Sequence, residues 1–315
     1  MGTPTLRQLR TFLAVVEAGS VSAAARLLNF TQPAASQQLR ELERALSVRL
    51  LDRAGGKVIP TAAGQALLYP ARRAQAAAED AITATAEHRR GDTGRVRLGT
   101  GATACIFLMP PVLAAVKRAM PGLAVTVVIG NTADVLVRLE AGDLDVALVT
   151  MPVPASRALS TTRLLSDPLL TLLPDALAPP GAAVTAAQLG AMPLILYESG
   201  GNSRAITDAW FRRAGITPRP TMEMGSAEAI KHLVGAGLGA TVLTSLALRS
   251  PVPGAVTRKL RPAASRDLGI ALRREKVRDR GLRLFLAELE QTVAEGWPAA
   301  PGAKLSNGPS GTRPA

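Results

Sequence analysis

One face of a short predicted helix near the N-terminus carries side chains that could contact DNA bases. The polar residues of this face recur at helical spacing and are Gln32, Ser36, Gln37 and Arg40. Amide, hydroxyl and guanidinium groups are those that bind base edges in the major groove. Thr31 is placed to cap the helix, and Pro33 is tolerated in its first turn. A surface helix of a small bundle would carry a similar face, so the face alone leaves both interpretations open.

A second group of small and polar residues could bind an anion. They follow predicted strands, in several cases just before a helix, and are Thr100, Gly101, Ala102, Thr103, Asn131, Thr150, Tyr197, Ser199, Gly200 and Ser203. Free N–H groups at a helix start attract a carboxylate, sulfate or phosphate. Ordinary capping and turn formation would also explain each residue. Arg204 could add a cation or form a surface ion pair. Glu198 does not suit an anion pocket and could bind an amine or hydroxyl, or point away.

Three helices are predicted to position the base-contacting face. The first spans 5–18, where apolar residues recur at i, i+3, i+4 and i+7, and Gly19 ends it. The second follows Ser22, a suitable N-cap for the alanine-rich run 23–28. The third spans 34–46, and its core-facing residues are Ala35, Leu39 and Leu42.

A β-hairpin is predicted directly after these helices. The extended segments 48–53 and 57–59 flank the turn residues Ala54, Gly55 and Gly56. Arg53 and Lys57 at its tip would then reach phosphates or the minor groove, as the wing of a winged helix-turn-helix. A solvated basic turn is the alternative, which the position after three such helices disfavours.

A long helix is predicted from Thr61 to about Arg90. Its apolar stripe is dominated by small residues and consists of Leu67, Leu68, Ala71, Ala74, Ala78, Ala81, Ile82 and Thr85. Small residues let two helices approach closely, so the stripe favours pairing with a second copy of the chain. An alanine-rich composition alone would also produce such a stripe.

Strands and helices alternate beyond the polar linker 91–94. The first predicted run is strand 96–99, helix 109–120, strand 123–129, helix 134–141 and strand 145–149. This βαβαβ order indicates a mostly parallel sheet with helices on both faces. Further segments are predicted at 159–165, 169–173, 194–197, 204–214, 220–224, 227–235, 240–243, 268–272 and 281–294. Residues 297–315 show no periodicity and are predicted to be a disordered tail.

Length, charge and cysteine content limit the classes of protein to which this chain can belong. The 315 residues suffice for two or more domains, and the net charge of +13 favours a polyanionic partner. Genomic bias toward arginine would raise the charge as well. The single cysteine, Cys105, excludes an internal disulfide and a cysteine-based zinc site, and two histidines make no persuasive metal cluster. No export signal or membrane span is recognised.

Residues 5–90 resemble the DNA-binding half of LysR-type transcriptional regulators. The stretches that carry the resemblance, in family order, are LRQLRTFLAVVEAGSVSAAARLL, TQPAASQQLRELE, VRLLDR and TAAG. Gln37 departs from the frequent arginine, which changes the expected base preference. Leu51 replaces a phenylalanine beneath the wing, and Pro60 replaces a leucine before the long helix.

The resemblance implies a mixed fold with a DNA-binding part and an effector-binding part. We expect an all-α winged helix-turn-helix domain at 1–60, a linker and dimerisation helix with a hinge at 61–92, and a two-lobed α/β effector domain at 93–296. The effector domain is expected to be similar to periplasmic binding proteins, with lobe one at 93–164 and 260–296 and lobe two at 165–259. The residues expected to contact DNA are Thr31, Gln32, Pro33, Ser36, Gln37, Arg40, Arg53 and Lys57. The small polar loop residues named above are expected to bind a small anion or organic acid between the lobes.

The implied function is sequence-specific transcription regulation in the bacterial cytoplasm, at the nucleoid. Implied partners are double-stranded DNA with a palindromic promoter site, RNA polymerase, and further copies of the chain in a homodimer through 61–90 and a homotetramer. No cofactor, metal or membrane partner is expected. A redox-responsive regulator acting through Cys105 is an alternative that lacks a partner thiol. A solute-binding protein would need an export signal and no DNA-binding part, and no enzyme motif is recognised.

Overall fold

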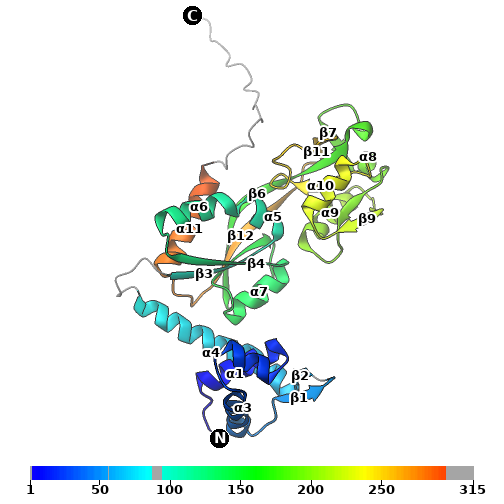
Figure 1. Cartoon of the computed structure of the whole chain (residues 1–315). Coiled ribbons are helices and arrows are strands. Elements are labelled where there is room, and N and C mark those ends of the chain that lie inside the picture. The colour runs from blue at the N-terminus through cyan, green and yellow to red at the C-terminus, as the bar shows by residue number, and fades with distance from the viewer. Residues whose placement is uncertain (1, 56, 87–93, 296–315) are drawn as a thin grey trace, which may run out of the picture.

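The computed structural model describes residues 2–55, 57–86 and 94–295 (Figure 1). The helices α1 (Leu6–Ala18), α2 (Val21–Leu27) and α3 (Gln32–Leu46) come first, followed by the hairpin strands β1 (Leu51–Ala54) and β2 (Lys57–Pro60). We call this part the head and its hairpin the wing. The architecture confirms the predicted winged helix-turn-helix.

Local capping explains where the helices of the head begin and end. Thr5 caps α1 in a capping box with Gln8, and Gly19 ends that helix with a left-handed φ of 61°. Thr31 accepts the Ala34 N–H at the start of α3. The predicted cap of α2 was wrong, because the Ser20 side chain accepts the Ala23 N–H and α2 begins at Val21.

Apolar side chains from all three helices fill the core of the head. The buried residues are Leu9, Phe12, Leu13, Val15, Ala24, Leu39, Leu42 and Leu50, with Ala71 from the next helix. That helix, α4 (Ala62–Ala86), leaves the head and extends toward the rest of the chain (Figure 1). Residues 87–93, where α4 was predicted to continue to about Arg90, lie outside the described residues.

The apolar stripe of α4 packs against the head in one part and is exposed in another. Leu67, Leu68, Ala71 and Ala74 pack against the core of the head, whereas the Ile82 side chain is 68% exposed. Between these two parts of the helix, Ala76 is buried against lobe one. The first half of the predicted pairing stripe is therefore used within the chain itself.

Lobe one is a sheet covered by helices on both faces. Its strands follow the order β4 (Leu123–Ile129), β3 (Gly94–Thr100), β5 (Val146–Met151), β12 (Ser265–Arg273) and the first half of β6 (Leu159–Pro174). The helices α5 (Ala102–Phe107), α6 (Met109–Ala119) and α11 (Arg280–Ala294) supply one core, and α7 (Thr132–Ala141) packs on the other face. Only β4, β3 and β5 run parallel, and β12 is antiparallel to both neighbours. The sheet is therefore mixed, which corrects the expectation of a mostly parallel one.

Strand β6 joins the two lobes. It runs for 16 residues, and its first half pairs with β12 while its second half pairs with β10 (Thr241–Thr244) and β11 (Ala255–Arg261). The sequence predicted two separate strands here, because Ser166, Asp167 and Pro168 interrupt the apolar pattern. The predicted lobe boundary at residue 164 falls inside this continuous strand, and the domain limits remain predictions.

Lobe two adds short strands and helices around the second half of β6. Its elements are η1 (Asp175–Leu177), β7 (Ala183–Thr185), α8 (Ala186–Gly190), β8 (Ile195–Tyr197), α9 (Asn202–Arg213), β9 (Met222–Met224) and α10 (Ala227–Gly235). Trp210 and Phe211 of α9 anchor its core in an edge-to-face contact. β7, α8 and β11 were not predicted, and the predicted tail at 297–315 lies outside the described residues.

Candidate functional site

The predicted base-contacting residues lie on the outer face of α3. Thr31, Gln32, Pro33, Gln37 and Arg40 are exposed, and Ser36 is half-buried and accepts a hydrogen bond from Gln32 Nε2 at 3.2 Å. The opposite face of α3 holds Ala35, Leu39 and Leu42 in the core, as predicted. The helix therefore presents polar groups outward from a rigid support.

Glu41, which sequence reasoning did not select, organises the amides around this face. Its carboxylate accepts hydrogen bonds from Gln37 Nε2 at 2.9 Å, from Gln38 Nε2 at 3.4 Å, and from Gln8 Nε2 of α1 at 3.4 Å. These bonds fix the orientation of the Gln37 amide. The Gln37 amide nitrogen carries a second hydrogen and its oxygen is an acceptor, so a base can bond either without displacing Glu41.

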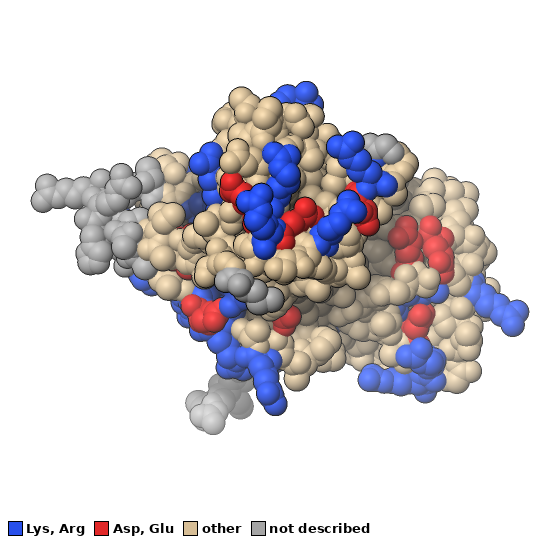
Figure 2. Space-filling view, turned by 90° about the horizontal axis from the view of Figure 1, so that it is seen from below, with Lys and Arg blue, Asp and Glu red and all other residues tan. Residues whose placement is uncertain are grey.

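The wing stands beside α3. Arg53 pairs with Val58 and Ala54 with Lys57 across the hairpin, and both cationic side chains are exposed. Glu43 of α3 holds the base of the wing, since its Oε1 accepts the Leu50 N–H at 2.8 Å. A groove between α3 and the wing is lined by Ser36, Arg40 and Arg53, among others. Figure 2 looks onto the head from below and shows Lys and Arg side chains gathered on this face, with Asp and Glu among them.

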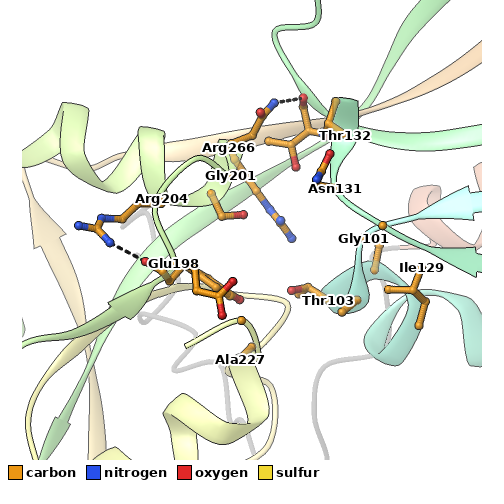
Figure 3. Close-up of a pocket in the computed structure, with 18 of the residues that line it drawn as sticks. Gly101, Thr103, Ile129, Asn131, Thr132, Glu198, Gly201, Arg204, Ala227 and Arg266 are labelled. Carbon is orange, nitrogen blue, oxygen red and sulfur yellow. Dashed lines mark hydrogen bonds between the residues drawn. The ribbon is translucent and has the colours of Figure 1, made fainter. Parts of the chain in front are cut away.

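A cleft of about 470 Å³ lies between the two lobes (Figure 3). The predicted residues that line it are Gly101, Ala102, Thr103, Asn131, Thr150, Tyr197, Ser199, Gly200 and Ser203. Thr100 does not line the cleft, because it is fully buried below Gly101. Residues that sequence reasoning missed also line it, and they include Ile129, Gly225, Ala227, Arg266 and Leu268.

The starts of four helices converge on the cleft. Two of them are capped by side chains, because Asn131 accepts the Asp134 N–H of α7 and Ser226 accepts the Ala229 N–H of α10. The glycines Gly101 and Gly201 precede α5 and α9 and offer no capping side chain. The first N–H groups of the 12-residue helix α9 are therefore free to bind an anion.

Arg266 supplies the cation that the sequence did not assign to this cleft. Its Nε and Nη2 donate to Asp167 Oδ2 at 3.0 and 2.9 Å, and its side chain is only 5% exposed. Asp167 is fixed in turn by Ser245 Oγ at 2.8 Å and the Leu246 N–H at 3.1 Å. Figure 3 shows the guanidinium of Arg266 reaching toward the space between Gly201 and Thr103. Within the described part of the chain, its Nη1 has no hydrogen-bond partner and remains available to a ligand.

Arg204 and Glu198 play different parts from Arg266. The Arg204 guanidinium points away from the cleft and binds Asp208 at 2.9 Å, Glu223 at 2.6 Å and the Tyr197 carbonyl at 2.6 Å (Figure 3). Its charge is therefore already matched. Glu198 is exposed at the cleft wall, close to Gly225, and places a carboxylate beside any ligand.

A hydrogen bond crosses the cleft from lobe two to lobe one. Asn202 Nδ2 donates to the Thr150 carbonyl at 3.0 Å. On the same wall of the cleft, burial raises the pKa of the Tyr197 hydroxyl. Tyr197 is therefore a neutral hydroxyl at physiological pH.

Cys105 lies on α5 beside the cleft loop but does not line the cleft. It is half-buried, and burial raises the pKa of its thiol. A raised pKa reduces the thiolate fraction on which oxidation depends. Among residues 2–55, 57–86 and 94–295, no cluster of His, Cys, Asp and Glu suits a metal ion. No helix within these ranges is long and apolar enough to cross a membrane.

Both parts of the chain match known families. Residues 6–65 match the family described as "Bacterial regulatory helix-turn-helix protein, lysR family". Residues 89–294 match the family described as "LysR substrate binding domain". The two matches correspond to the head with the start of α4 and to the two lobes.

Similar proteins match along nearly the whole chain. The HTH-type transcriptional regulator CbbR of Xanthobacter flavus is 32% identical, over 99% of this chain and 96% of CbbR. The solved structure of full-length CbnR complexed with its target DNA has a TM-score of 0.66 at 26% identity, covering 91% of this chain and 99% of CbnR. A full-length OxyR variant from Pseudomonas aeruginosa has a TM-score of 0.75 and covers 92% of this chain and 95% of its own, but at 23% identity it shows the fold alone.

Proposed function

We propose that this chain, which belongs to the LysR family of bacterial transcription regulators, binds a small anion between its lobes and reports this binding to promoter DNA through the head. The family makes the chain a DNA-binding transcription regulator with an effector-binding domain. The residues that contact DNA, the chemical class of the effector and the assembly are our proposal.

In the head, α3 enters the major groove and the wing binds the backbone. Gln32, Ser36 and Arg40 contact base edges from the exposed start of the helix, with Thr31, Pro33 and Gln37 beside them. Arg53 and Lys57 bind phosphates. Their exposure supports this role, and within the described residues Arg40, Arg53 and Lys57 form no ion pair. An enzymatic activity is not part of the proposal.

Simultaneous replacement of Gln32, Ser36 and Arg40 by alanine tests the base contacts. We expect a gel shift to show loss of binding to the cognate promoter, while binding to unrelated DNA and the thermal melting temperature change little. Equal loss on both DNAs, or unfolding of the variant, would contradict the assignment of these residues to base contacts.

The assembly that we propose is a homodimer through 61–90, further paired into a homotetramer. The exposure of the Tyr69 side chain on α4 supports this. Two heads related by a two-fold axis require a palindromic site whose half-sites lie about 34–36 Å apart or a multiple of that. Contact with RNA polymerase and action in the cytoplasm, at the nucleoid, follow from the same role.

The effector site is the cleft, and one observation carries this proposal. The uncapped N-terminus of α9 and the guanidinium of Arg266 line the same cavity, so free N–H groups and a cation meet around one space. Such a site binds a carboxylate, sulfate or phosphate group. Thr103, Asn131, Thr150, Tyr197 and Ser203 add polar atoms that can orient the rest of the ligand.

Calorimetry with sulfate, phosphate, acetate and larger organic acids tests the anion class. We expect at least one of these anions to bind, and Arg266→Lys to weaken the binding at least about tenfold, because lysine lacks the planar fork that holds Asp167 and the ligand together. Arg163→Lys is the matched control, since Arg163 pairs with Asp267 on the surface. Absence of binding by every anion, or equal affinity in Arg266→Lys, would overturn the anion class.

A further inference from the structure

The charged side chains of the cleft do not suit a ligand that is only an anion. Among the described residues that line the cleft, those with a charge are Glu198, Arg204 and Arg266. Arg204 is already matched by two carboxylates, and Arg266 is matched by Asp167. Within residues 2–55, 57–86 and 94–295, the Glu198 carboxylate forms no hydrogen bond or ion pair. The unmatched side-chain charge of this lining is therefore negative.

The backbone fixes Glu198 at the wall of the cleft. Tyr197, the last residue of β8, lies opposite Met224 of β9, and the Glu198 N–H donates to the Met224 carbonyl at 3.2 Å. Gly225 follows, and a Cβ atom added there would lie 3.1 Å from Glu198 Oε1, so the carboxylate packs over a residue without a side chain. Figure 3 shows this carboxylate directed toward the space that the Arg266 guanidinium also enters. The fold therefore presents a free carboxylate to a ligand.

The groups that attract an anion border the same space. Arg266 keeps its Nη1 available, and α9 begins after Gly201 with free N–H groups. A small ligand between Arg266 and Glu198 therefore meets a cation at one end and a carboxylate at the other. Sulfate, phosphate or a simple carboxylate would satisfy the first but place a like charge beside the second, which is unfavourable. A ligand that carries an ammonium group as well as an acidic group satisfies both.

The rest of the cleft lining is uncharged and partly apolar. Ile129, Leu148, Ala227 and Leu268 contribute apolar surface, and Figure 3 places Ile129 on the opposite side of the space from Glu198. An apolar wall with a few placed polar groups is typical of small-molecule sites. A third charge on the ligand would find no free charged partner among the described lining residues. The part of the ligand that lies against this wall is therefore expected to be uncharged.

We propose that the effector is a zwitterion of the amino-acid type with an uncharged side chain. Its acidic group binds Arg266 and the start of α9, and its ammonium group binds Glu198. The inference rests on the proposed function, because it uses the same anion site. It adds a second site for the ammonium group, so anions without an amine bind more weakly than the zwitterion.

Three matched compounds separate the two ends of the ligand. A thermal-shift screen of the standard amino acids with uncharged side chains selects the tightest binder. Calorimetry on the full-length protein then compares this amino acid with its deamino acid, which lacks the ammonium group, and with its amide, which lacks the carboxylate. We expect each analogue to bind at least about tenfold more weakly, because each loses a hydrogen bond between charged groups. Absence of binding by every amino acid would overturn the inference.

Unequal losses distinguish the inference from the proposed function. If only the amide binds more weakly, the anion site stands and the zwitterion is excluded. If only the deamino acid binds more weakly, the anion class itself fails, and the zwitterion fails with it. A 2-hydroxy acid with the same side chain that binds as tightly as the amino acid would show that Glu198 accepts from a neutral hydroxyl, and would overturn the assignment of an ammonium group.

Glu198→Gln tests the residue itself. Because the side chain is exposed and forms no ion pair within the described residues, we expect the variant to fold. We expect it to bind the amino acid at least about tenfold more weakly and the deamino acid no more weakly than the wild type does. Asp175→Asn is the matched control, since it removes an exposed carboxylate of lobe two outside the cleft, and should change neither affinity. Unchanged discrimination between the two ligands in Glu198→Gln would overturn the role of Glu198.

Reversal of the charge at this position gives the second variant. Glu198→Lys places a cation where the ammonium group is proposed to bind, so we expect the deamino acid to bind more tightly than the amino acid. The thermal melting temperature, measured beside the affinities, confirms that the variant is folded. A retained preference for the amino acid in Glu198→Lys would contradict an ammonium site at residue 198.

Discussion

The proposed base-contacting surface of the head and the buried ion pairs between α4 and lobe one use the same residue types in opposite surroundings. These ion pairs join Asp80 of α4 to Arg273 and Lys276 of lobe one, and Lys276 also pairs with Asp145. Arg40, Arg53 and Lys57 are exposed on the head, and within the described residues none of them forms an ion pair. Arg273 and Lys276 are buried and pair with carboxylates, and Arg273 Nη1 also donates to two backbone carbonyls. Exposed cations are free to exchange counterions for phosphates, whereas buried ones specify a single packing. The surroundings of a charge, more than its identity, therefore decide whether it binds a partner or holds the fold.

The largest expected effect lies on the buried side of this comparison. Lys276→Met removes the cation that Asp80 and Asp145 share, and leaves Asp80 with Arg273 and Asp145 with Arg97. We expect the free energy of unfolding to fall by about 1.5–3 kcal/mol, the range for hydrogen bonds to charged groups. Urea denaturation at neutral pH measures it. Lys57→Met, on the exposed wing, should change stability by no more than about 0.5 kcal/mol. Equal effects of the two substitutions would remove the distinction between the regions.

Arg40→Ala should act on DNA binding and leave stability alone. We expect a loss of about 1–3 kcal/mol in binding to the cognate site, the range for a good contact to a base edge. Fluorescence anisotropy with cognate and scrambled duplexes measures it. Arg44→Ala is the control, because Arg44 is exposed on the same helix but lies in its last turn. A larger loss of binding for Arg44→Ala would place the base contacts at the C-terminal end of α3 and contradict the proposal.

Arg53→Ala should weaken binding to every DNA sequence to a similar degree. A phosphate contact releases counterions, so we expect the slope of log affinity against log salt to decrease in size by about one. Titrations at several salt concentrations on cognate and scrambled duplexes give the slope. An unchanged slope would argue that Arg53 does not contact phosphate.

The smallest expected effect concerns the acid sensitivity of the buried ion pairs that Asp145 forms with Arg97 and Lys276. The pKa of folded Asp145 lies below its ordinary value of 3.8, so the folded protein holds this carboxylate deprotonated more strongly than the unfolded chain does. Its contribution to stability is present above that ordinary value and is lost as the pH falls through the lowered one. Asp145→Asn should therefore flatten the decline of stability in acid, measured by urea denaturation between pH 2 and 6. A decline as steep as in the wild type would assign the acid sensitivity to other carboxylates.

The sequence could predict the head because its signals are local. Thr5, Gly19 and Thr31 cap helices within three residues of their partners, and the apolar face of α3 repeats at helical spacing. The wing was predictable because a glycine-containing turn lies between two short extended segments. Even here Ser22 was predicted as the cap of α2, whereas the cap is Ser20, which stands before the same alanine-rich run.

Of the residues that line the cleft, the sequence could predict only those in the loops that follow strands. Small polar residues after strands mark the starts of α5, α7 and α9, and these loops do meet in one cavity. The position of Arg266 in the cleft was not predicted, because its partner Asp167 lies 99 residues away and no local pattern links them. The same pair explains why β6 continues through a segment that interrupts the apolar pattern: Asp167 lies opposite Arg266 across the strands. Contacts over such separations become visible only in the folded chain.

Strand β6 also sets how the two lobes can move. Lobes joined by slack loops can swing about a hinge, but here one continuous strand runs through both and is hydrogen-bonded on each side of the crossing. Relative motion must therefore bend or twist a paired sheet, which resists in proportion to the distortion. We expect small elastic displacements in place of a wide opening and shutting. A ligand that binds weakly would therefore displace the lobes only slightly, and the size of the displacement would follow the strength of binding.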